Sequence, residues 1–412
     1  MSNLYYPLNS LKQGHWFKLI CGASFQHLPA VRNLTLAYSL AGADCIDVAA
    51  DPAVIAAAQE ALQSAEALAP AARRRGFKDS KRPWLMVSLN DGEDPHFRKA
   101  EFNPAACPAD CPRPCESICP AQAIVFQDAD ARGKSGSGKH QKTSHIQNLN
   151  VEPGFSGVID QQCYGCGRCL PVCPIQQIVT RSYVATPAAV APMVLATDVD
   201  AVEIHTQVGR VADFRRLWNA IAPWVGKLKL VAISCGDGEG LIDYLHTLYE
   251  LISPLPCPLI WQTDGRPMSG DIGDGTTRAA VKLGEKVLAA GLPGYVQLAG
   301  GTNSHTVAKL KAAGLLKREG TATGEEPCRL PSHIAGIAYG SYARVLLSPV
   351  LEQLEPITQA FAVAASSQGT QLARLEDTPE LLWAAVSLAD SLVNQLKTHK
   401  IAPTLAQQIP MI

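Results

Sequence analysis

The chain alternates short, continuous apolar runs with longer stretches in which apolar side chains recur every three or four residues. The short runs predict buried strands, and the longer stretches predict helices that cover them. The predicted strands are residues 17–22, 43–48, 84–89, 201–205, 228–234, 258–262, 294–298 and 333–338. The predicted helices are residues 28–40, 52–75, 211–225, 241–252, 276–290, 306–315 and 342–354, with a further amphipathic stretch at 379–397.

This order predicts an α/β fold with a parallel sheet. Three strands precede residue 90 and five follow residue 200, which makes eight strand–helix units, the number in a (βα)8 TIM barrel. An open doubly wound sheet is the alternative, because it uses the same units without requiring eight of them. The predicted organisation is residues 1–97 for the first part of the barrel, 98–183 for an insert, 184–358 for the rest of the barrel, and 359–412 for a helical extension over its outside or one end.

Composition and charge narrow the classes of function. The 412 residues are 47% hydrophobic and 18% charged, with a formal net charge of −1, so the chain carries no electrostatic footprint for nucleic acid or an anionic membrane surface. The N-terminal residues lack the order of a secretory signal, and no apolar run approaches the ~20 residues of a membrane span. The thirteen cysteines follow the spacings of metal ligation rather than of disulfides. We therefore expect a cytoplasmic protein without a membrane span.

Eight of the cysteines lie in two runs. The second run, Cys163-Tyr-Gly-Cys166-Gly-Arg-Cys169-Leu-Pro-Val-Cys173-Pro174, has the C-x2-C-x2-C-x3-C-P spacing with which bacterial ferredoxins hold a [4Fe–4S] cluster. The first run has three residues in every gap, and its cysteines are Cys107, Cys111, Cys115 and Cys119. The two cysteine–proline steps lie 54 residues apart, and residues 98–102 and 157–160 are candidate strands leading into the runs. The insert is therefore predicted to be a duplicated, two-cluster ferredoxin-like unit.

In two-cluster ferredoxins the last cysteine of each run ligates the other cluster. This rule predicts one cluster held by Cys163, Cys166, Cys169 and Cys119, and a second held by Cys107, Cys111, Cys115 and Cys173. Scattered structural thiols or a zinc site are the alternative for the second run. Prolines stiffen the gaps of the wider first run, and there the alternative is one idle thiol, which would leave a three-iron [3Fe–4S] cluster. The predicted cofactors are two iron–sulfur clusters.

A polar loop between the two runs nearly contains a phosphate-binding P-loop at residues 133–139. His140 stands where that motif needs a Ser or Thr for magnesium, and no apolar helix follows. A flexible, basic surface loop is the favoured interpretation.

Glycine-rich turns follow the last two predicted strands, at the barrel end where TIM barrels commonly bind phosphate. The candidate phosphate-binding residues are Gly300, Gly301, Thr302, Asn303, Gly340 and Ser341. Flavin mononucleotide (FMN) would suit such a site, because it could exchange electrons with the clusters. The alternative is that the glycines form tight turns and the polar residues cap helices. Weaker strand-end candidates, each more often structural, are His205, Cys235, Asp237, Asp264 and Arg266.

The chain resembles a known family in three places: residues 14–24 (Gly-His-Trp-Phe-Lys-Leu-Ile-Cys-Gly-Ala-Ser), the paired cysteine runs, and residues 299–306 (Ala-Gly-Gly-Thr-Asn-Ser-His-Thr). Together these are similar to the cyanobacterial light-dependent period (LdpA) family. The resemblance implies an iron–sulfur protein that reports cellular redox state, and so light intensity, to the circadian clock. It further implies association with the clock protein KaiA and the input kinase CikA. It brings no catalytic residues, and only the eight cysteines correspond to cluster positions.

Three functions are consistent with this sequence. The leading hypothesis is a redox sensor whose clusters exchange electrons with a carrier such as ferredoxin or quinone and alter a surface that partners bind. The competing hypothesis is a flavin-dependent oxidoreductase of the TIM-barrel type, connected to ferredoxin through the clusters. The third is a scaffold whose clusters only stabilise the fold of the insert.

Overall fold

The computed structural model describes residues 6–78, 81–93, 95–119, 121–126, 155–160, 162–182, 194–265, 275–317, 333–354 and 374–397. The P-loop-like segment at 133–140 lies outside the described residues, and so does Arg266. Within the described ranges, no helix combines the length and the apolar character that crossing a bilayer requires.

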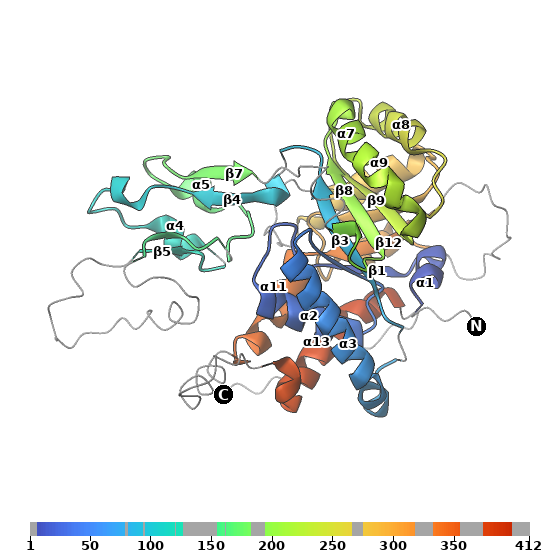
Figure 1. The fold of residues 1–412 in the computed structure, drawn as a ribbon, viewed down its shortest axis with the longest axis horizontal. Helices are drawn as coiled ribbons and strands as arrows, with labels where there is room; N and C mark the ends of the chain where they lie inside the picture. Colours follow the sequence, from blue (N-terminus) through green and yellow to red (C-terminus); the bar gives the residue numbers. More distant parts are fainter. Residues whose placement is uncertain are drawn as a thin grey trace.

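Eight parallel strands close into a barrel, which confirms the predicted TIM-like fold (Figure 1). The strands are β1 (Trp16–Ile20), β2 (Cys45–Ala49), β3 (Trp84–Asn90), β8 (Ala201–Thr206), β9 (Leu230–Gly236), β10 (Leu259–Asp264), β11 (Tyr295–Ala299) and β12 (Ile334–Tyr339). Each strand pairs with its neighbours in chain order, and β12 pairs back to β1 with Gly336 opposite Trp16. This closure rules out the open doubly wound sheet.

Helices cover the outside of the barrel. They are α2 (Leu28–Leu40), α3 (Pro52–Arg74), α7 (Val211–Ile221) with the 3-10 helix η4 (Ala222–Lys227), α8 (Leu241–Ile252), α9 (Thr277–Ala289), α10 (Thr306–Ala312) and α11 (Ser341–Leu351). The start of α3 is fixed by the Asp51 carboxylate, which accepts hydrogen bonds from the N–H groups of Ala53 and Val54. β3 leads into the insert, where the strand–helix alternation was expected to stop. In the described part of that connection, only residues 194–195 are helical next to β8.

The interior of the barrel consists of layers of different chemistry. Near the N-terminal ends of the strands, Trp16, Met86 and Ile260 belong to an apolar layer that α1 (Pro7–Gln13) extends with Leu11. Side chains two positions further along a strand point to the same face. Those positions form a second, buried layer that is polar, made of Lys18, Asp47, Ser88, Glu203, Ser234, Gln262 and Gln297. Branched apolar residues dominate most TIM-barrel interiors, so this polar layer is a departure.

The C-terminal extension contains a helix, α13 (Pro379–Lys397), that packs on the outside of the barrel against α2 and α11. Its last residue reaches the N-terminal end of the barrel. There the Lys397 ammonium donates to both carboxylate oxygens of Asp44 at 2.8 Å, and both side chains are buried. Asp44 also accepts hydrogen bonds from Ser10 Oγ and Phe17 N. One helix thus covers a side of the barrel and ties down one end.

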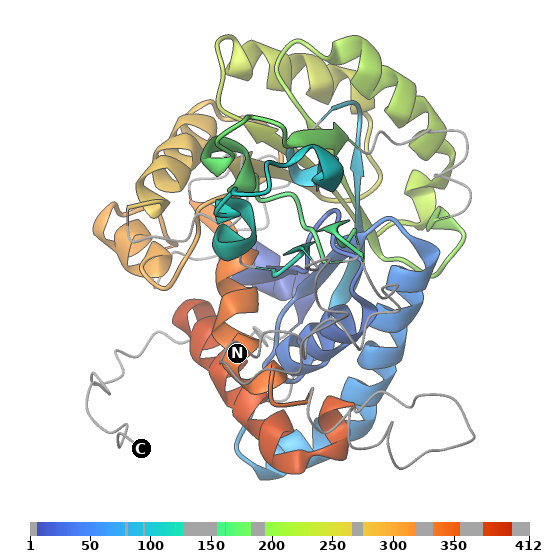
Figure 2. The same ribbon diagram turned by 90° about the vertical axis from the view of Figure 1, so that its left-hand side faces the viewer.

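The insert stands over the barrel mouth formed by the C-terminal ends of the strands (Figures 1 and 2). Its elements are η1 (Pro95–Phe97), β4 (Arg98–Glu101), η2 (Pro104–Ala106), α4 (Pro114–Ile118), β5 (Ile124–Val125), β6 (Gly157–Val158), α5 (Cys169–Val172) and β7 (Val179–Ser182). β4 pairs antiparallel with β7, and β5 pairs antiparallel with β6. The strand that enters each half therefore pairs with the strand that leaves the other half, so the halves interlock.

Candidate functional site

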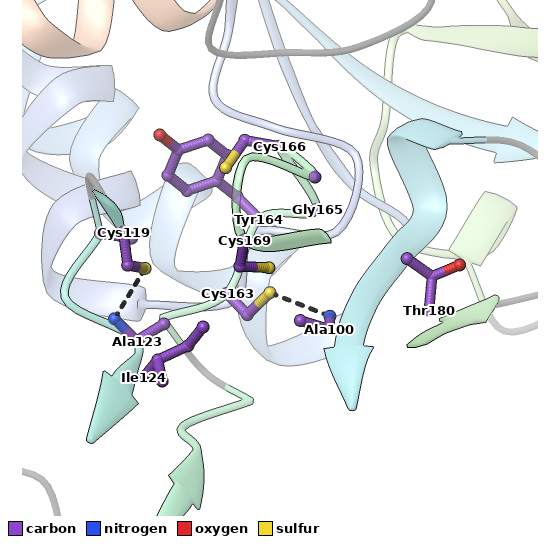
Figure 3. A pocket seen from close by; sticks show the side chains of 12 residues that line it. Ala100, Cys119, Ala123, Ile124, Cys163, Tyr164, Gly165, Cys166, Cys169 and Thr180 are labelled. Atoms are coloured by element: carbon purple, nitrogen blue, oxygen red, sulfur yellow. Dashed lines mark hydrogen bonds between the residues drawn. The ribbon is translucent and has the colours of Figure 1, made fainter. Parts of the chain in front are cut away.

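Four cysteines from both halves of the insert line one pocket, with their side chains gathered around it (Figure 3). They are Cys119, Cys163, Cys166 and Cys169. Ala100, Ala123 and Ile124 supply apolar parts of the lining. The last cysteine of the first run thus lies beside three cysteines of the second run, as the ferredoxin rule predicts for the positions of one ligand set.

Backbone geometry shapes the loop that carries three of these cysteines. Gly165 and Gly167 both have a φ of 72°, a left-handed conformation that glycine adopts without steric cost. The N–H group of Ala100 donates to Cys163 Sγ at 3.3 Å, and that of Ala123 donates to Cys119 Sγ at 3.2 Å. Hydrogen bonds to sulfur favour the thiolate, which is the form that binds a metal.

The other four cysteines of the two runs form a second group. Cys107 is close enough to Cys111 and Cys173 for their charges to raise the pKa of its thiol, after the larger effect of burial. Cys115 experiences the charges of Cys173 and Cys107 in the same way. The N–H group of Gln177 donates to Cys173 Sγ at 3.3 Å. This set again combines three cysteines of one run with the last cysteine of the other.

The two halves repeat each other in backbone conformation at one point and differ at another. Gln122 and Gln176, each three residues after the last cysteine of a run, have φ values of 50° and 51°. At the start of α4, Arg113 has a left-handed φ of 52°, whereas Arg168 before α5 has a φ of −60°. The wider first run therefore forces a non-glycine residue into a sparsely populated conformation, which the second run avoids.

The electrostatics of the pocket lined by Cys119, Cys163, Cys166 and Cys169 favour a positive centre among these cysteines. Burial, followed by the neighbouring Cys166, Cys163 and Cys119, raises the pKa of Cys169 to about 12. Burial likewise raises the pKa of Cys166, although the N–H group of Arg168 opposes it. Thiols this close cannot all ionise unless a positive centre lies among them. The irons of an iron–sulfur cluster supply that positive charge and prefer thiolate ligands, so the residues fit such a cluster.

The pocket is joined to the barrel through Tyr164, which follows Cys163. The ring of Tyr164 lies edge-to-face against Phe25, with ring centroids 6.3 Å apart, and 5.0 Å beneath the guanidinium of Arg344. Arg344, near the start of α11, also donates to the carbonyl oxygens of Ile20 and Cys21 at 3.1 and 3.0 Å. Arg344 therefore links Tyr164, which lies between Cys163 and Cys166, to the C-terminal end of β1.

The predicted phosphate loops have their side chains engaged in internal hydrogen bonds. Thr302 Oγ1 donates to the carbonyl of Ala338 at 2.6 Å, and Asn303 Oδ1 accepts from the N–H group of His305 at 2.9 Å. Ser341 Oγ accepts from Arg344 at 2.9 Å. Gly300 and Gly301 have φ values of 61° and 91°, as tight turns require, while Gly340 has a φ of −106°. These bonds suit the interpretation of turns and caps; phosphate or FMN binding stays a prediction that rests on backbone N–H groups.

The weaker strand-end candidates fall on different surfaces. His205 and Asp264 face the barrel mouth and are 6% and 8% exposed. The side chain of Cys235 belongs instead to the apolar core between the strands and the helices that cover them. Asp237 is exposed and forms an ion pair with Lys286 at 2.6 Å.

The polar layer below His205 was not predicted from the sequence. Lys18 Nζ lies 2.9 Å from Asp47 Oδ2 and also forms an ion pair with Glu203. Gln262 donates to Glu203 Oε1 at 2.7 Å and accepts from Lys18 at 3.0 Å. Burial lowers the pKa of Lys18, but the carboxylates of Asp47 and Glu203 outweigh this effect and hold that pKa above its usual value. Burial would raise the pKa of Glu203, but Lys18 and His205 lower it to about 2. These charged residues can be recognised in the sequence, because each of them lies in the middle of an otherwise apolar strand.

Comparisons with known proteins agree on both parts of the chain. Residues 107–184 match the profile of the LdpA Fe-S cluster-binding domain, and residues 193–395 match that of the Light dependent period A C-terminal domain. The chain is similar to Light dependent period A of Synechococcus elongatus, with 46% identity over 392 residues that cover 95% of this chain and 94% of that protein. The described cysteine runs therefore belong to an iron–sulfur cluster-binding domain.

Proposed function

The chain belongs to the light dependent period A family, and on that premise we propose that it is an iron–sulfur redox sensor that relays the redox state of the cell, and with it light intensity, to the circadian clock. The observation that carries this proposal is the convergence of Cys119 with Cys163, Cys166 and Cys169 around one pocket, whose loop contacts the barrel through Tyr164. A sensor needs both parts: a redox site and a connection from that site to a surface.

We assign two clusters to the insert, one to each group of four cysteines. The interlocked pairing of β4 with β7 and of β5 with β6 supports this assignment, because it brings the last cysteine of each run to the other half. The pocket lined by Cys119, Cys163, Cys166 and Cys169 suits a [4Fe–4S] cluster. The wider run suits either a [4Fe–4S] or a [3Fe–4S] cluster, and its strained Arg113 makes it the more labile of the two.

The path from the cluster site to the barrel begins at Tyr164. When bound, a cluster supplies a one-electron change of charge at the thiolates. Arg344 is the cation that faces the ring of Tyr164, and it is held by Ile20 O, Cys21 O and Ser341 Oγ. A more negative charge beside Tyr164 would strengthen the attraction to Arg344, because both side chains are half-buried and water screens their interaction only in part. The loop after β1 and the start of α11 are therefore the parts of the barrel that we expect to respond.

The partners in this proposal are KaiA and the input kinase CikA, with ferredoxin or quinone as the redox carrier. The family membership supports the clock partners. The near-neutral charge of the chain gives no reason to add nucleic acid or a membrane surface as a partner.

The test is anaerobic purification followed by iron and sulfide analysis, EPR and binding of KaiA under oxidising and reducing conditions. Cys163→Ser and Cys166→Ser should each lose one cluster and the redox dependence of binding. Cys257→Ser is the matched control, because that thiol is half-buried and lies outside both runs. The sensor proposal is wrong if wild-type binding is the same in both redox states, or if both cluster variants retain the redox dependence.

A flavin-dependent oxidoreductase is the second candidate, and the polar interior of the barrel mouth is the observation in its favour. FMN would have to bind through the N–H groups near Gly300, Gly301 and Gly340. Purified protein with a flavin spectrum and NAD(P)H- or ferredoxin-dependent turnover would support it. Purified protein without flavin, and without affinity for added FMN, would exclude it.

A further inference from the structure

Three side chains with metal-binding atoms meet at the barrel mouth, where the insert begins. His96 stands on η1 directly before β4, His205 lies near the end of β8, and Asp264 is the last residue of β10. One ligand atom from each residue lies within 4.8 Å of the other two. We propose that His96, His205 and Asp264 bind one first-row divalent transition-metal ion at a site separate from the cysteines.

The set of donors defines the class of ion. Two imidazoles and one carboxylate suit Fe²⁺, Mn²⁺ or Zn²⁺ and leave coordination positions open, whereas thiolate sites select softer centres. A metal–nitrogen or metal–oxygen bond is about 2.1 Å long, so two ligand atoms on one ion are at most about 4.2 Å apart. The three ligand atoms lie within 4.8 Å of one another, so none of their separations exceeds that limit by more than about 0.6 Å.

The two barrel ligands are held by partners of the kind that orient metal ligands. His205 Nε2 lies 2.8 Å from Glu203 Oε1, and Ser234 Oγ donates to Asp264 Oδ2 at 2.8 Å. A carboxylate on one ring nitrogen of a metal-binding histidine fixes the tautomer and makes the ring a stronger ligand. The rings of His96 and Phe97 each lie with their centroids 5.2 Å from that of His205, so the ligands of the insert and the barrel pack together.

The buried charges beneath the site favour a cation. The described residues of this part of the interior include three carboxylates, on Asp47, Glu203 and Asp264, and one ammonium, on Lys18. The carboxylates outnumber the ammonium, so the excess charge of this region is negative, and a divalent ion would offset it. Buried charge without such compensation is unfavourable. A bound ion would also tie the base of the insert to β8 and β10.

The experiment uses cluster-loaded protein, dialysed against a chelator, with Mn²⁺ as the probe. Mn²⁺ prefers imidazole and carboxylate to thiolate, so it discriminates against the cysteines. Loss of the room-temperature EPR signal of free Mn²⁺ measures binding. Wild-type protein should bind one Mn²⁺ per chain. Ser234→Ala should weaken binding by about 10-fold, and the ligand variants His96→Ala and Asp264→Asn by about 100-fold or more.

Three controls make the result decisive. His246→Ala removes an exposed histidine of α8 and should bind Mn²⁺ as wild-type protein does. Cys163→Ser should also retain Mn²⁺ binding, which separates this site from the cluster function. Circular dichroism of His96→Ala checks the fold. Absence of Mn²⁺ binding to the wild-type protein overturns the proposal, and so does wild-type affinity in both His96→Ala and Asp264→Asn.

Discussion

Breaking the buried ion pair between Asp44 and Lys397 should destabilise the protein strongly, and replacing Lys397 by Met tests this. The ammonium lies 2.8 Å from both oxygens of Asp44, and the two side chains are 1% and 0% exposed. Among the described residues, the variant leaves the Asp44 carboxylate with two neutral donors, Ser10 Oγ and Phe17 N. Removing one partner of a buried pair costs about 3–5 kcal/mol, because the other charge stays buried without compensation.

The size of the effect can be converted into a melting temperature. Unfolding entropy near the midpoint is about 2.1 cal/mol/K per residue, so a chain of 412 residues gives about 0.9 kcal/mol/K. A loss of 3–5 kcal/mol then lowers Tm by about 3–6 °C. The assay is thermal and urea unfolding followed by circular dichroism, with wild-type and variant protein carrying equal cluster content.

Two controls separate burial from charge. Lys286→Met breaks the pair with Asp237, which is similarly short at 2.6 Å but has side chains 43% and 62% exposed, so we expect a loss below about 1 kcal/mol. The double variant Asp44→Asn with Lys397→Met removes both buried charges and should recover most of the loss. A loss in Lys397→Met no larger than that in Lys286→Met would refute the reasoning.

The pH dependence has a defined sign. Burial raises the pKa of Asp44, even though Lys397, Phe17 N and Ser10 lower it. Without Lys397 that pKa rises further, so the penalty for a buried carboxylate is full at neutral pH. It fades as falling pH protonates Asp44 in the folded state. The stability difference between Lys397→Met and wild-type protein should therefore be smaller at pH 5 than at pH 7.5, and a larger difference at pH 5 would contradict this account.

Three further outcomes follow from the structure. Burial, with Lys317 and His15 nearby, lowers the pKa of His333 to about 4. The free energy of unfolding should therefore fall by at most about 3 kcal/mol as the pH falls from 6.5 to 4. In His333→Gln this decrease should be smaller, as measured by urea unfolding at each pH. A Cβ on Gly336 would lie 2.3 Å from Trp16 O, so Gly336→Ala should destabilise the barrel by about 1–3 kcal/mol or more in urea unfolding, while Gly226→Ala, with open space around it, should change stability by less than about 0.5 kcal/mol. Arg344→Met should speed hydrogen exchange in residues 162–173 and leave exchange in the barrel strands unchanged. Arg344→Lys should retain only part of the wild-type protection, because lysine lacks the planar fork of donors. Equal exchange in all three proteins would refute a connection between Tyr164 and the barrel through Arg344.

The barrel could be predicted from the sequence because each strand is a short apolar run and each helix an amphipathic stretch. The segments 241–252 and 379–397 begin and end at the predicted residues. The grouping of the eight cysteines was predictable for a different reason, since spacing and duplication constrain which thiols can meet. Both kinds of pattern are local, or repeat at a fixed distance along the chain.

The polar interior of the barrel could not be assembled in the same way. Lys18 and Glu203 are 185 residues apart, and their pairing depends on closure and register of the whole sheet. The hydrogen-bond partners of Thr302 and Asn303 could not be predicted for a related reason. Their hydrogen bonds to Ala338 and His305 use the loop itself and the neighbouring strand, which the sequence does not place in space.

The interlocked pairing inside the insert has a consequence for how the protein is made. The strand at residues 98–101 finds its partner only when residues 179–182 have left the ribosome. On the proposed ligation, each cluster also draws one cysteine from the other half, so neither cluster can be completed on a partly synthesised insert. Delivery of iron and sulfide must then come after translation of the second cysteine run. The two sites therefore become available for loading together, late in the synthesis of the insert, and each cluster can afterwards be lost on its own.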